Sequence, residues 1–229
     1  ASAFGYSNEA SGLASSAVGF RNKAASENAS AVGYGNNANA LAASAVGYNN
    51  TAGGVGSSTI GYNNTATNEN ASAFGYGNTA GGLASSAFGF SNTASGDNAN
   101  AFGYNNIASG SKSNVFGTGN TVSGSSSNAV GTANEVAAEN STAIGNNNTI
   151  SSGAENSAAL GNNISISLKD SVALGNNSTA TAINSVTGNS SYTKWAGVSD
   201  VVGVVSVGSS GATRQIQNVA AGQVSATST

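Results

Sequence analysis

The sequence predicts an all-β fold, a solenoid of short coils stacked in parallel, and three observations lead to this prediction. Glycine recurs every fourteen residues from Gly5 to Gly145, and after a two-residue insertion at Gly161 and Gly175, so thirteen units fill residues 1–180. Around each glycine, bulky and small residues alternate with period two, which is typical of a β-strand. A fourteen-residue unit is also too short for a helical pair or a propeller blade.

The composition excludes several classes of function. The 229 residues include no His, Cys, Met or Pro, so imidazole catalysis, thiol nucleophiles, disulfides and Cys/His zinc sites are ruled out. Six scattered basic residues and a net charge of −3 make no basic stripe for nucleic acid. Only three Asp are present, too few for a calcium-binding solenoid, and we expect no metal or cofactor.

No stretch of the sequence reaches the length of an apolar membrane span, so we expect no membrane contact by this segment. The sequence starts at Ala1 without an initiator Met or a signal-peptide pattern, and we expect a mature segment or a fragment of a longer protein.

The first element of each unit is a strand centred on its glycine, which we number position 0. Position −2 is Ala in eleven of thirteen units, and position +1 is Tyr or Phe in the first eight. Positions −1 and +1 share one bulky face, whereas Ala and Gly share a nearly flat one. The large apolar residue at −1 is expected to be the repeat core: Phe4, Val18, Val32, Val46, Ile60, Phe74, Phe88, Phe102, Phe116, Val130, Ile144, Leu160 and Leu174.

The second half of each unit predicts a tight turn, a short strand and a second turn. Asn fills position +3 in eleven units, from Asn8 to Asn148, and we expect it to be the turn residue with left-handed backbone. Position +5 is always Ala, Val or Ile. When the units stack, the aromatic residues and the asparagines should form ladders along the rod.

The flat Ala/Gly face predicts that several copies associate lengthwise, because small residues permit close approach. The alternative is that these small residues fill a cramped coil interior. Position +8 mixes apolar and acidic residues and lies either at a subunit boundary or simply in solvent: Leu13, Glu27, Leu41, Val55, Glu69, Leu83 and Asp97. Glu9 and Lys23 should be stacked neighbours, either paired or separately solvated.

Three motifs with functional meanings are weak here. Thr occupies position +4 in seven units, which suggests the hypothesis of an ice-binding surface. Such a surface needs paired columns of Thr, whereas a single interrupted column is present here. Gly117, Gly119 and Gly124 lack the spacing and the Lys-Ser/Thr of a phosphate loop. Glu135, Glu139 and Glu155 occupy different columns, so a carboxylate acid/base pair is not expected and the chain is predicted not to be an enzyme.

Two segments carry a resemblance to a known family. Residues 171–175, Ser-Val-Ala-Leu-Gly, are similar to the head repeats of trimeric autotransporter adhesins of the YadA-like type, and residues 206–222, SVGSSGATRQIQNVAAG, are similar to the neck of that family. The resemblance implies a left-handed parallel β-roll, a homotrimer, and a neck leading to a coiled-coil stalk. It also implies a C-terminal barrel that anchors the protein in a bacterial outer membrane, with this segment at the cell surface.

The domain boundaries follow from the repeats and the neck. We expect a YadA-like head at 1–180, an insertion or cap region at 181–205, and a neck leading to the stalk at 206–229. The Val/Gly run from 198 to 207 should pair with the last coil or with another subunit. Trp195 is expected to close the base of the roll, with an exposed binding anchor as the alternative. The resemblance implies neck and trimer contacts by Arg214, Gln215, Ile216, Asn218 and Val219.

The expected function is that of an adhesin head that attaches to extracellular matrix proteins, host cell receptors or abiotic surfaces and promotes cell–cell aggregation. Its recurring polar surface would act by multivalency, without a pocket. The alternatives are a spacer or cap of the fibre, with binding elsewhere in the parent chain, and an ice-binding solenoid.

Overall fold

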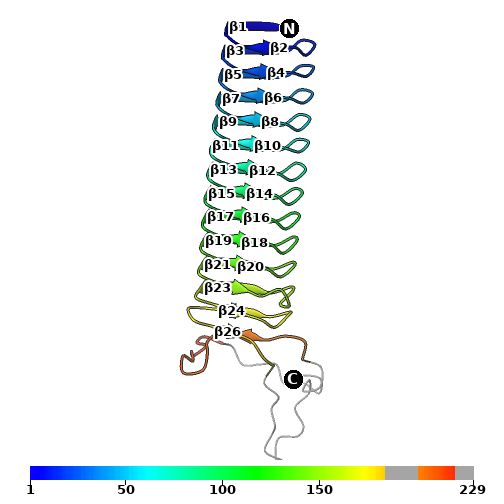
Figure 1. Cartoon of the computed structure of the whole chain (residues 1–229). Helices are drawn as coiled ribbons and strands as arrows, with labels where there is room; N and C mark the ends of the chain where they lie inside the picture. Colours follow the sequence, from blue (N-terminus) through cyan, green and yellow to red (C-terminus); the bar gives the residue numbers. More distant parts are fainter. Residues whose placement is uncertain (184–200, 220–229) are drawn as a thin grey trace, which may run out of the picture.

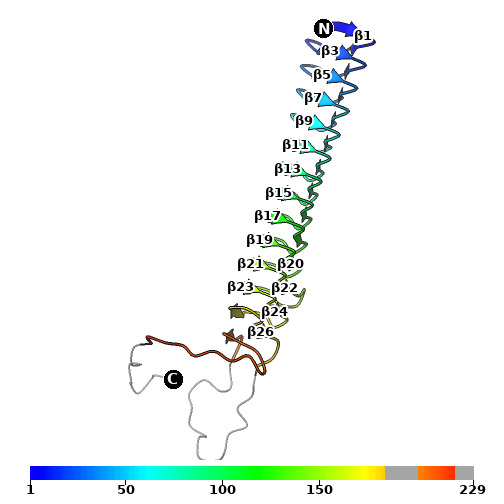
Figure 2. The ribbon, with the colours of Figure 1, turned by 90° about the vertical axis from the view of Figure 1, so that its left-hand side faces the viewer.

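The structure is a computed structural model that describes residues 1–183 and 201–219. Its strands stack in chain order into a long, narrow rod, with the N-terminal residue at one end and residues 201–219 at the other (Figures 1 and 2). Nowhere in the described residues is there a helix that is long and apolar enough to cross a membrane.

Two parallel sheets run the length of the rod, and successive strands of the chain belong alternately to one sheet and to the other. The long strands form one sheet: β1 (Ser2–Tyr6), β3 (Ser16–Phe20), β5 (Ser30–Tyr34), β7 (Ser44–Tyr48), β9 (Ser58–Tyr62), β11 (Ser72–Tyr76), β13 (Ser86–Phe90), β15 (Asn100–Tyr104), β17 (Asn114–Thr118), β19 (Asn128–Thr132), β21 (Thr142–Asn146), β23 (Ala158–Asn162), β25 (Val172–Leu174) and β27 (Val205–Ser206).

The short strands form the other sheet: β2 (Glu9–Ala10), β4 (Lys23–Ala24), β6 (Asn37–Ala38), β8 (Thr51–Ala52), β10 (Thr65–Ala66), β12 (Thr79–Ala80), β14 (Thr93–Ala94), β16 (Ile107–Ala108), β18 (Thr121–Val122), β20 (Glu135–Val136), β22 (Thr149–Ile150), β24 (Ser165–Ile166) and β26 (Thr179–Ala180). Each coil is therefore a long strand, a short turn, a short strand and a longer turn, as the repeat predicts.

The register confirms the fourteen-residue coil. Residues pair with their equivalents one unit further along, as Phe88 does with Phe102 and Gly89 with Gly103. The two extra residues lie in the turn between β22 and β23, and Gly145 still pairs with Gly161. An insertion confined to a turn leaves the ladder intact because no strand pairing has to shift. The all-β, parallel solenoid of about thirteen coils is thus confirmed.

The prediction of left-handed backbone at position +3 is wrong by one residue. The positive φ angles fall at position +2, for example 55° at Asn49 and 53° at Asn105, and again at position +9, for example 57° at Asn98. The asparagine at +3 follows the left-handed residue, and its side chain points into the coil. The turn lies where the sequence predicts it. The +3 asparagine, however, is a buried interior residue and not the left-handed residue of the turn.

The interior consists of small side chains in four columns at positions −2, +3, +5 and +10. Ala101, Asn106, Ala108 and Ser113 represent these columns in one coil, and all four are completely buried. Further along the chain the interior gains bulk, with Val115, Val122, Val136, Ile150, Ile164 and Ile166 among its members. The alanine face is therefore buried within each single chain, which is the cramped-interior alternative.

Two expectations are corrected by this arrangement. The alanines do not form a surface for other copies, and the large apolar residues at position −1 are not the core of the coil. Ile60 is 46% and Leu160 52% exposed, because two sheets closed by two- and five-residue turns leave no room for such side chains between them. They lie on the outer face: Phe4, Val18, Val32, Val46, Ile60, Phe74, Phe88, Phe102, Phe116, Val130, Ile144, Leu160 and Leu174.

The repeat glycine is required by both its backbone and its neighbours. Gly103 has φ +123°, which side chains of L residues rarely adopt, and an added Cβ would overlap the carbonyl oxygen of Gly117 in the next coil. The strict recurrence of glycine therefore reflects the close stacking of one coil on the next.

The end of the rod is closed by a fourteenth rung. β27 pairs in parallel with β25, through Val172 with Val205 and Ala173 with Ser206. Thr179 in the other sheet donates its backbone N–H to the Gly208 carbonyl at 2.9 Å. The predicted pairing of the Val/Gly run with the last coil is confirmed for these residues, and it satisfies backbone groups that would otherwise be free.

Candidate functional site

The exposed columns of the rod are held in line by a buried ladder of asparagines at position +3. The Asn106 Nδ2 donates to Asn92 Oδ1 at 3.0 Å, to the Phe102 carbonyl at 3.0 Å and to the Gly117 carbonyl at 2.7 Å. Its Oδ1 accepts the backbone N–H and the Nδ2 of Asn120, both at 3.0 Å. Each asparagine thus links three successive coils, and the predicted pairing of amides is confirmed.

On the outer face, position +1 forms an aromatic column over the first eight coils. Consecutive rings stack nearly parallel, with centroids 4.7 to 5.2 Å apart. The separation follows from the spacing of paired strands, so each ring covers the face of the next and leaves its edge in solvent. The column comprises Tyr6, Phe20, Tyr34, Tyr48, Tyr62, Tyr76, Phe90 and Tyr104.

The outer apolar column at position −1 runs beside the aromatic column on the same strands. Phe74, Phe88, Phe102 and Phe116 stack within it, with centroids 4.8 to 5.1 Å apart. A continuous apolar strip of this length on a single soluble chain typically marks a surface that meets a partner. The sequence pattern predicted that these residues form the core of the coil, so it did not predict this outer apolar surface.

Charged and hydroxyl side chains decorate the rest of the rod sparsely. Lys23 and Glu9 are stacked neighbours as predicted and are paired rather than separately solvated, at 3.3 Å between Nζ and Oε2, with about half of each side chain exposed. Arg21 lies over the Phe20 ring, 5.1 Å from its centroid. The threonines at position +4 begin the short strands from Thr51 to Thr93, and Ile107 interrupts their column in the next coil. The apolar residues at position +8 are exposed along the longer turns.

The three glutamates considered as an acid/base set lie on different elements. Glu135 begins β20, Glu139 lies in the turn after it, and Glu155 lies in the longer turn that follows β22. Among residues 1–183 and 201–219, no three Asp or Glu residues gather where they could hold a metal ion.

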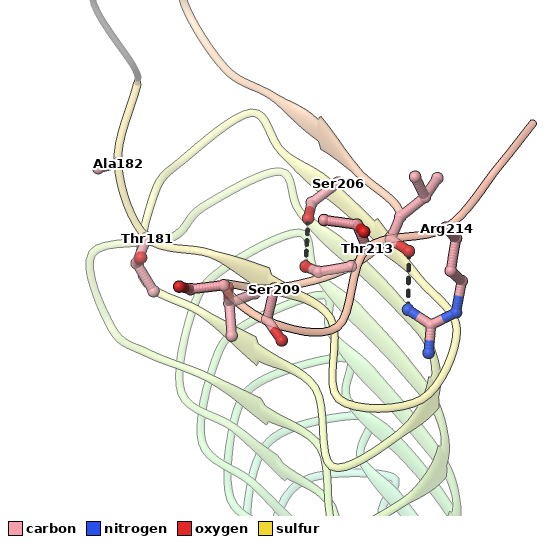
Figure 3. Close-up of a pocket in the computed structure, with 10 residues that line it drawn as sticks. Thr181, Ala182, Ser206, Ser209, Thr213 and Arg214 are labelled. Atoms are coloured by element: carbon pink, nitrogen blue, oxygen red, sulfur yellow. Dashed lines mark hydrogen bonds between the residues drawn. The ribbon is translucent and has the colours of Figure 1, made fainter.

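The described surface is hollowed at the base of the rod, where a pocket of about 430 Å³ lies between the last coil and residues 206–214. Its polar lining is mainly hydroxyl and backbone groups, with Arg214 as the charged member (Figure 3). Ser206 Oγ donates to the Gly208 carbonyl at 2.9 Å and helps shape the loop. No nucleophile–base pair is found among the residues that line this pocket.

Arg214 fastens the start of the predicted neck to the last coil. Its Nη1 donates to the Val207 carbonyl at 2.7 Å and to Ser178 Oγ at 3.3 Å, and its Nη2 donates to the Asn176 carbonyl. Two of these three partners are backbone carbonyls, and all three belong to the same chain as Arg214. Ser178 occupies position +3 of the last coil, which is the position of the buried asparagines in earlier coils. Arg214 therefore contacts the C-terminal end of that column.

The other predicted neck contacts, Gln215, Ile216, Asn218 and Val219, are all exposed in the single chain. Their role in a trimer therefore stays a prediction. Trp195 lies outside the described residues, as do the tail from residue 220 onward and the polar stretch that begins at residue 184.

The same solenoid pattern appears in a known family. Five segments match the YadA head domain repeat (2 copies), namely residues 1–22, 52–78, 80–106, 123–148 and 169–186. Together they cover more than half of the chain. The chain belongs to the YadA head family. No curated protein matches the sequence.

Membership in this family identifies the kind of protein to which these repeats belong. The YadA head repeats form β-solenoids and are the heads of trimeric autotransporter adhesins, which are exposed at the surface of the outer membrane. The YadA head is a non-enzymatic domain, and the function of this chain is accordingly that of an adhesin head. The resemblance drawn from residues 171–175 is thus confirmed.

Proposed function

We propose that this adhesin head attaches to extracellular matrix proteins, host cell receptors or abiotic surfaces, and promotes cell–cell aggregation, through its whole length. The observation that carries the proposal is the in-register recurrence of half-buried polar side chains on the outside of the coils. Thr51, Thr65, Thr79 and Thr93 stand one above another at the start of successive short strands. Identical groups at regular intervals let contacts that are weak individually add by avidity.

The head is proposed to be a homotrimer of left-handed β-rolls that pack along the outer apolar column. The exposed side chains at position −1 support this arrangement, since they include residues as large as Phe116 and Leu160 and line the rod from end to end. Burying one such side chain is worth about 1.5 to 3 kcal/mol, so three copies that cover this column gain substantially. The large residues, rather than the alanines, are then the lengthwise contact.

Three functional regions are proposed along the chain: the head at 1–180, a cap at 181–205 and the neck at 206–229, which leads to a coiled-coil stalk and a C-terminal outer-membrane barrel. The fourteenth rung supports a capping role for the end of the second region. The exposure of Ile216 and Val219 supports contacts with neighbouring subunits in the neck. Arg214 would make the same carbonyl contacts with a neighbour if the neck segments of the trimer exchange partners.

An in-register deletion tests the distributed surface. Removing residues 36–77 takes out three coils and joins Gly35 to Asn78, which keeps the fourteen-residue spacing. We expect this variant to sediment as a trimer and to bind less well to a panel of immobilised matrix proteins and to an abiotic surface. Unchanged adhesion would refute a distributed surface and favour the spacer role.

A substitution of the whole segment separates these two roles. Replacing residues 1–180 with an unrelated trimeric head of equal length would preserve the reach of the fibre but not its surface. Retained adhesion by the full fibre would show that binding resides elsewhere in the parent chain.

A further inference from the structure

The rod has two different edges, and each carries its own exposed column. Figure 1 shows the long turns along one edge and the chain reversing sharply along the other. The aromatic column stands at the short-turn edge, because position +1 is the last residue of each long strand. We call position +8 the long-turn column, because it lies midway in the five-residue turn between a short strand and the next long strand. The width of the coil separates the two columns, so they cannot cover each other within one chain.

Both columns carry large apolar side chains over the first coils and none of them in coils nine to twelve. The long-turn column carries Leu13, Leu41, Val55 and Leu83 in four of the first six coils, with exposed fractions between 43% and 73%, and Glu27 and Glu69 in the other two. It then continues as Ser111, Ser125 and Glu139. The aromatic column ends at Tyr104 and continues as Thr118, Thr132 and Asn146. Nothing within the single chain requires two separate edges to change together.

A ring of three parallel rods explains why they change together. In a cyclic trimer each contact joins two different surfaces of neighbouring copies, so every copy must present both halves of the contact. An apolar column on one edge then needs an apolar column of the same extent on the other. The outer apolar column lies between the two edges and would face the three-fold axis.

We propose that the aromatic column of one copy packs against the long-turn column of the next copy, over coils one to eight. This proposal rests on the trimer proposed above and specifies which side chains form the contact between neighbouring copies, which we call the seam. Leucine and valine methyl groups would meet the exposed ring edges, which stay free because the ring faces are stacked on one another. Glu27, Glu69 and Asp97 of the long-turn column would offer carboxylate acceptors to tyrosine hydroxyls of the neighbour.

The contact also determines which surface remains for ligands. With both edges and the face between them covered in the first eight coils, the sheet of short strands is the face left to solvent there. Adhesion through the upper half of the rod would then depend on the residues that begin those strands, such as Thr65 and Thr79. Below Tyr104 the seams are polar and would be weaker.

Cysteine cross-linking tests the contact directly, because the chain contains no cysteine of its own. Tyr48→Cys is combined in turn with Leu41→Cys, Val55→Cys or Glu69→Cys, treated with a short bismaleimide and run on a denaturing gel. We expect a covalent trimer from at least one pair, which fixes the register of the seam, and only monomer from each single variant. Tyr48→Cys with Thr51→Cys is the control pair and should stay monomeric on the gel, because Thr51 begins a strand of the solvent-facing sheet.

Three results would overturn the proposal, and they separate it from the trimer itself. Covalent dimers from Tyr48→Cys alone would mean that aromatic columns meet one another. No covalent trimer from any pair, with an intact trimer in sedimentation, would exclude this seam while leaving the proposed assembly standing. A monomeric unsubstituted chain would exclude both.

Discussion

Breaking one rung of the asparagine ladder should destabilise the head far more than changing the exposed asparagine beside it. Asn106→Ala removes the two N–H groups of Nδ2, which three acceptors share, and the two hydrogen bonds that its Oδ1 accepts. The buried backbone N–H of Asn120 then loses its acceptor, which costs about 1 to 3 kcal/mol. The two N–H groups of Nδ2 and the bond accepted from Asn120 Nδ2 amount to three further bonds at a net 0.5 to 1.5 kcal/mol each, which brings the expected loss to about 2.5 to 7.5 kcal/mol in the free energy of unfolding.

Asn105→Ala is the matched control, since Asn105 is exposed and precedes Asn106 directly. Its backbone is left-handed, with φ 53°, but Ala133 adopts the same φ at the equivalent position of another coil. The expected cost is therefore only about 1 kcal/mol, from the weaker preference of alanine for this conformation. The pair separates the loss of the ladder from the mere loss of an asparagine.

Native-state hydrogen exchange at the Asn120 amide is the sharpest measurement, because solenoids can open locally without unfolding as a whole. Asn106→Ala should accelerate exchange at this amide by at least about a hundredfold if the loss reaches 3 kcal/mol, since 1.4 kcal/mol corresponds to a factor of ten. Chemical denaturation at matched protein concentration gives the global value. Equal effects of Asn106→Ala and Asn105→Ala on both measurements would refute the structural role assigned to the ladder.

Two further predictions concern the interior and the surface. Gly103→Ala should abolish the stable head or lower its melting temperature sharply in a thermal scan, because an added Cβ would overlap the Gly117 carbonyl oxygen at a positive φ; a melting temperature within a few degrees of the original would contradict the close-stacking argument. Lys23→Gln should cost at most about 0.5 kcal/mol in denaturant titration, with little change when salt is added, because the ion pair with Glu9 is half exposed; a loss above about 1.5 kcal/mol would show that this pair is more than a surface contact.

The period of the sequence was sufficient to predict the coil and its stacking. A glycine with a bulky residue before it and an asparagine three positions after it recur at one spacing, so a parallel stack places like residues side by side. The aromatic column and the amide ladder follow directly, because both need only that position +1 or +3 of one coil lies above the same position of the next. The Glu9 and Lys23 pair could be predicted for the same reason.

The sequence could not decide which face of the long strand lies inside. Both faces are apolar, one carrying alanine and the other Val, Ile, Leu or Phe, and alternation alone does not say which is buried. Preference for the larger side chains as core is sound for wide sheets, but it fails for a coil closed by turns of two and five residues. The diameter of the coil is a tertiary property, and it admits Ala101 and Ala108 while leaving Phe102 outside.

The base of the rod shows the same division. The sequence by itself determined the repeat, the stacking and the resemblance of the last segment to a neck. Only the tertiary structure decided that Val205 adds a rung below Val172, that position +2 carries the left-handed turn, and that Arg214 lies against the carbonyls of Val207 and Asn176. The contacts of Val205 with Val172 and of Arg214 with Asn176 join residues more than thirty positions apart, and the turn depends on the room inside one coil. A fourteen-residue period carries no information about either.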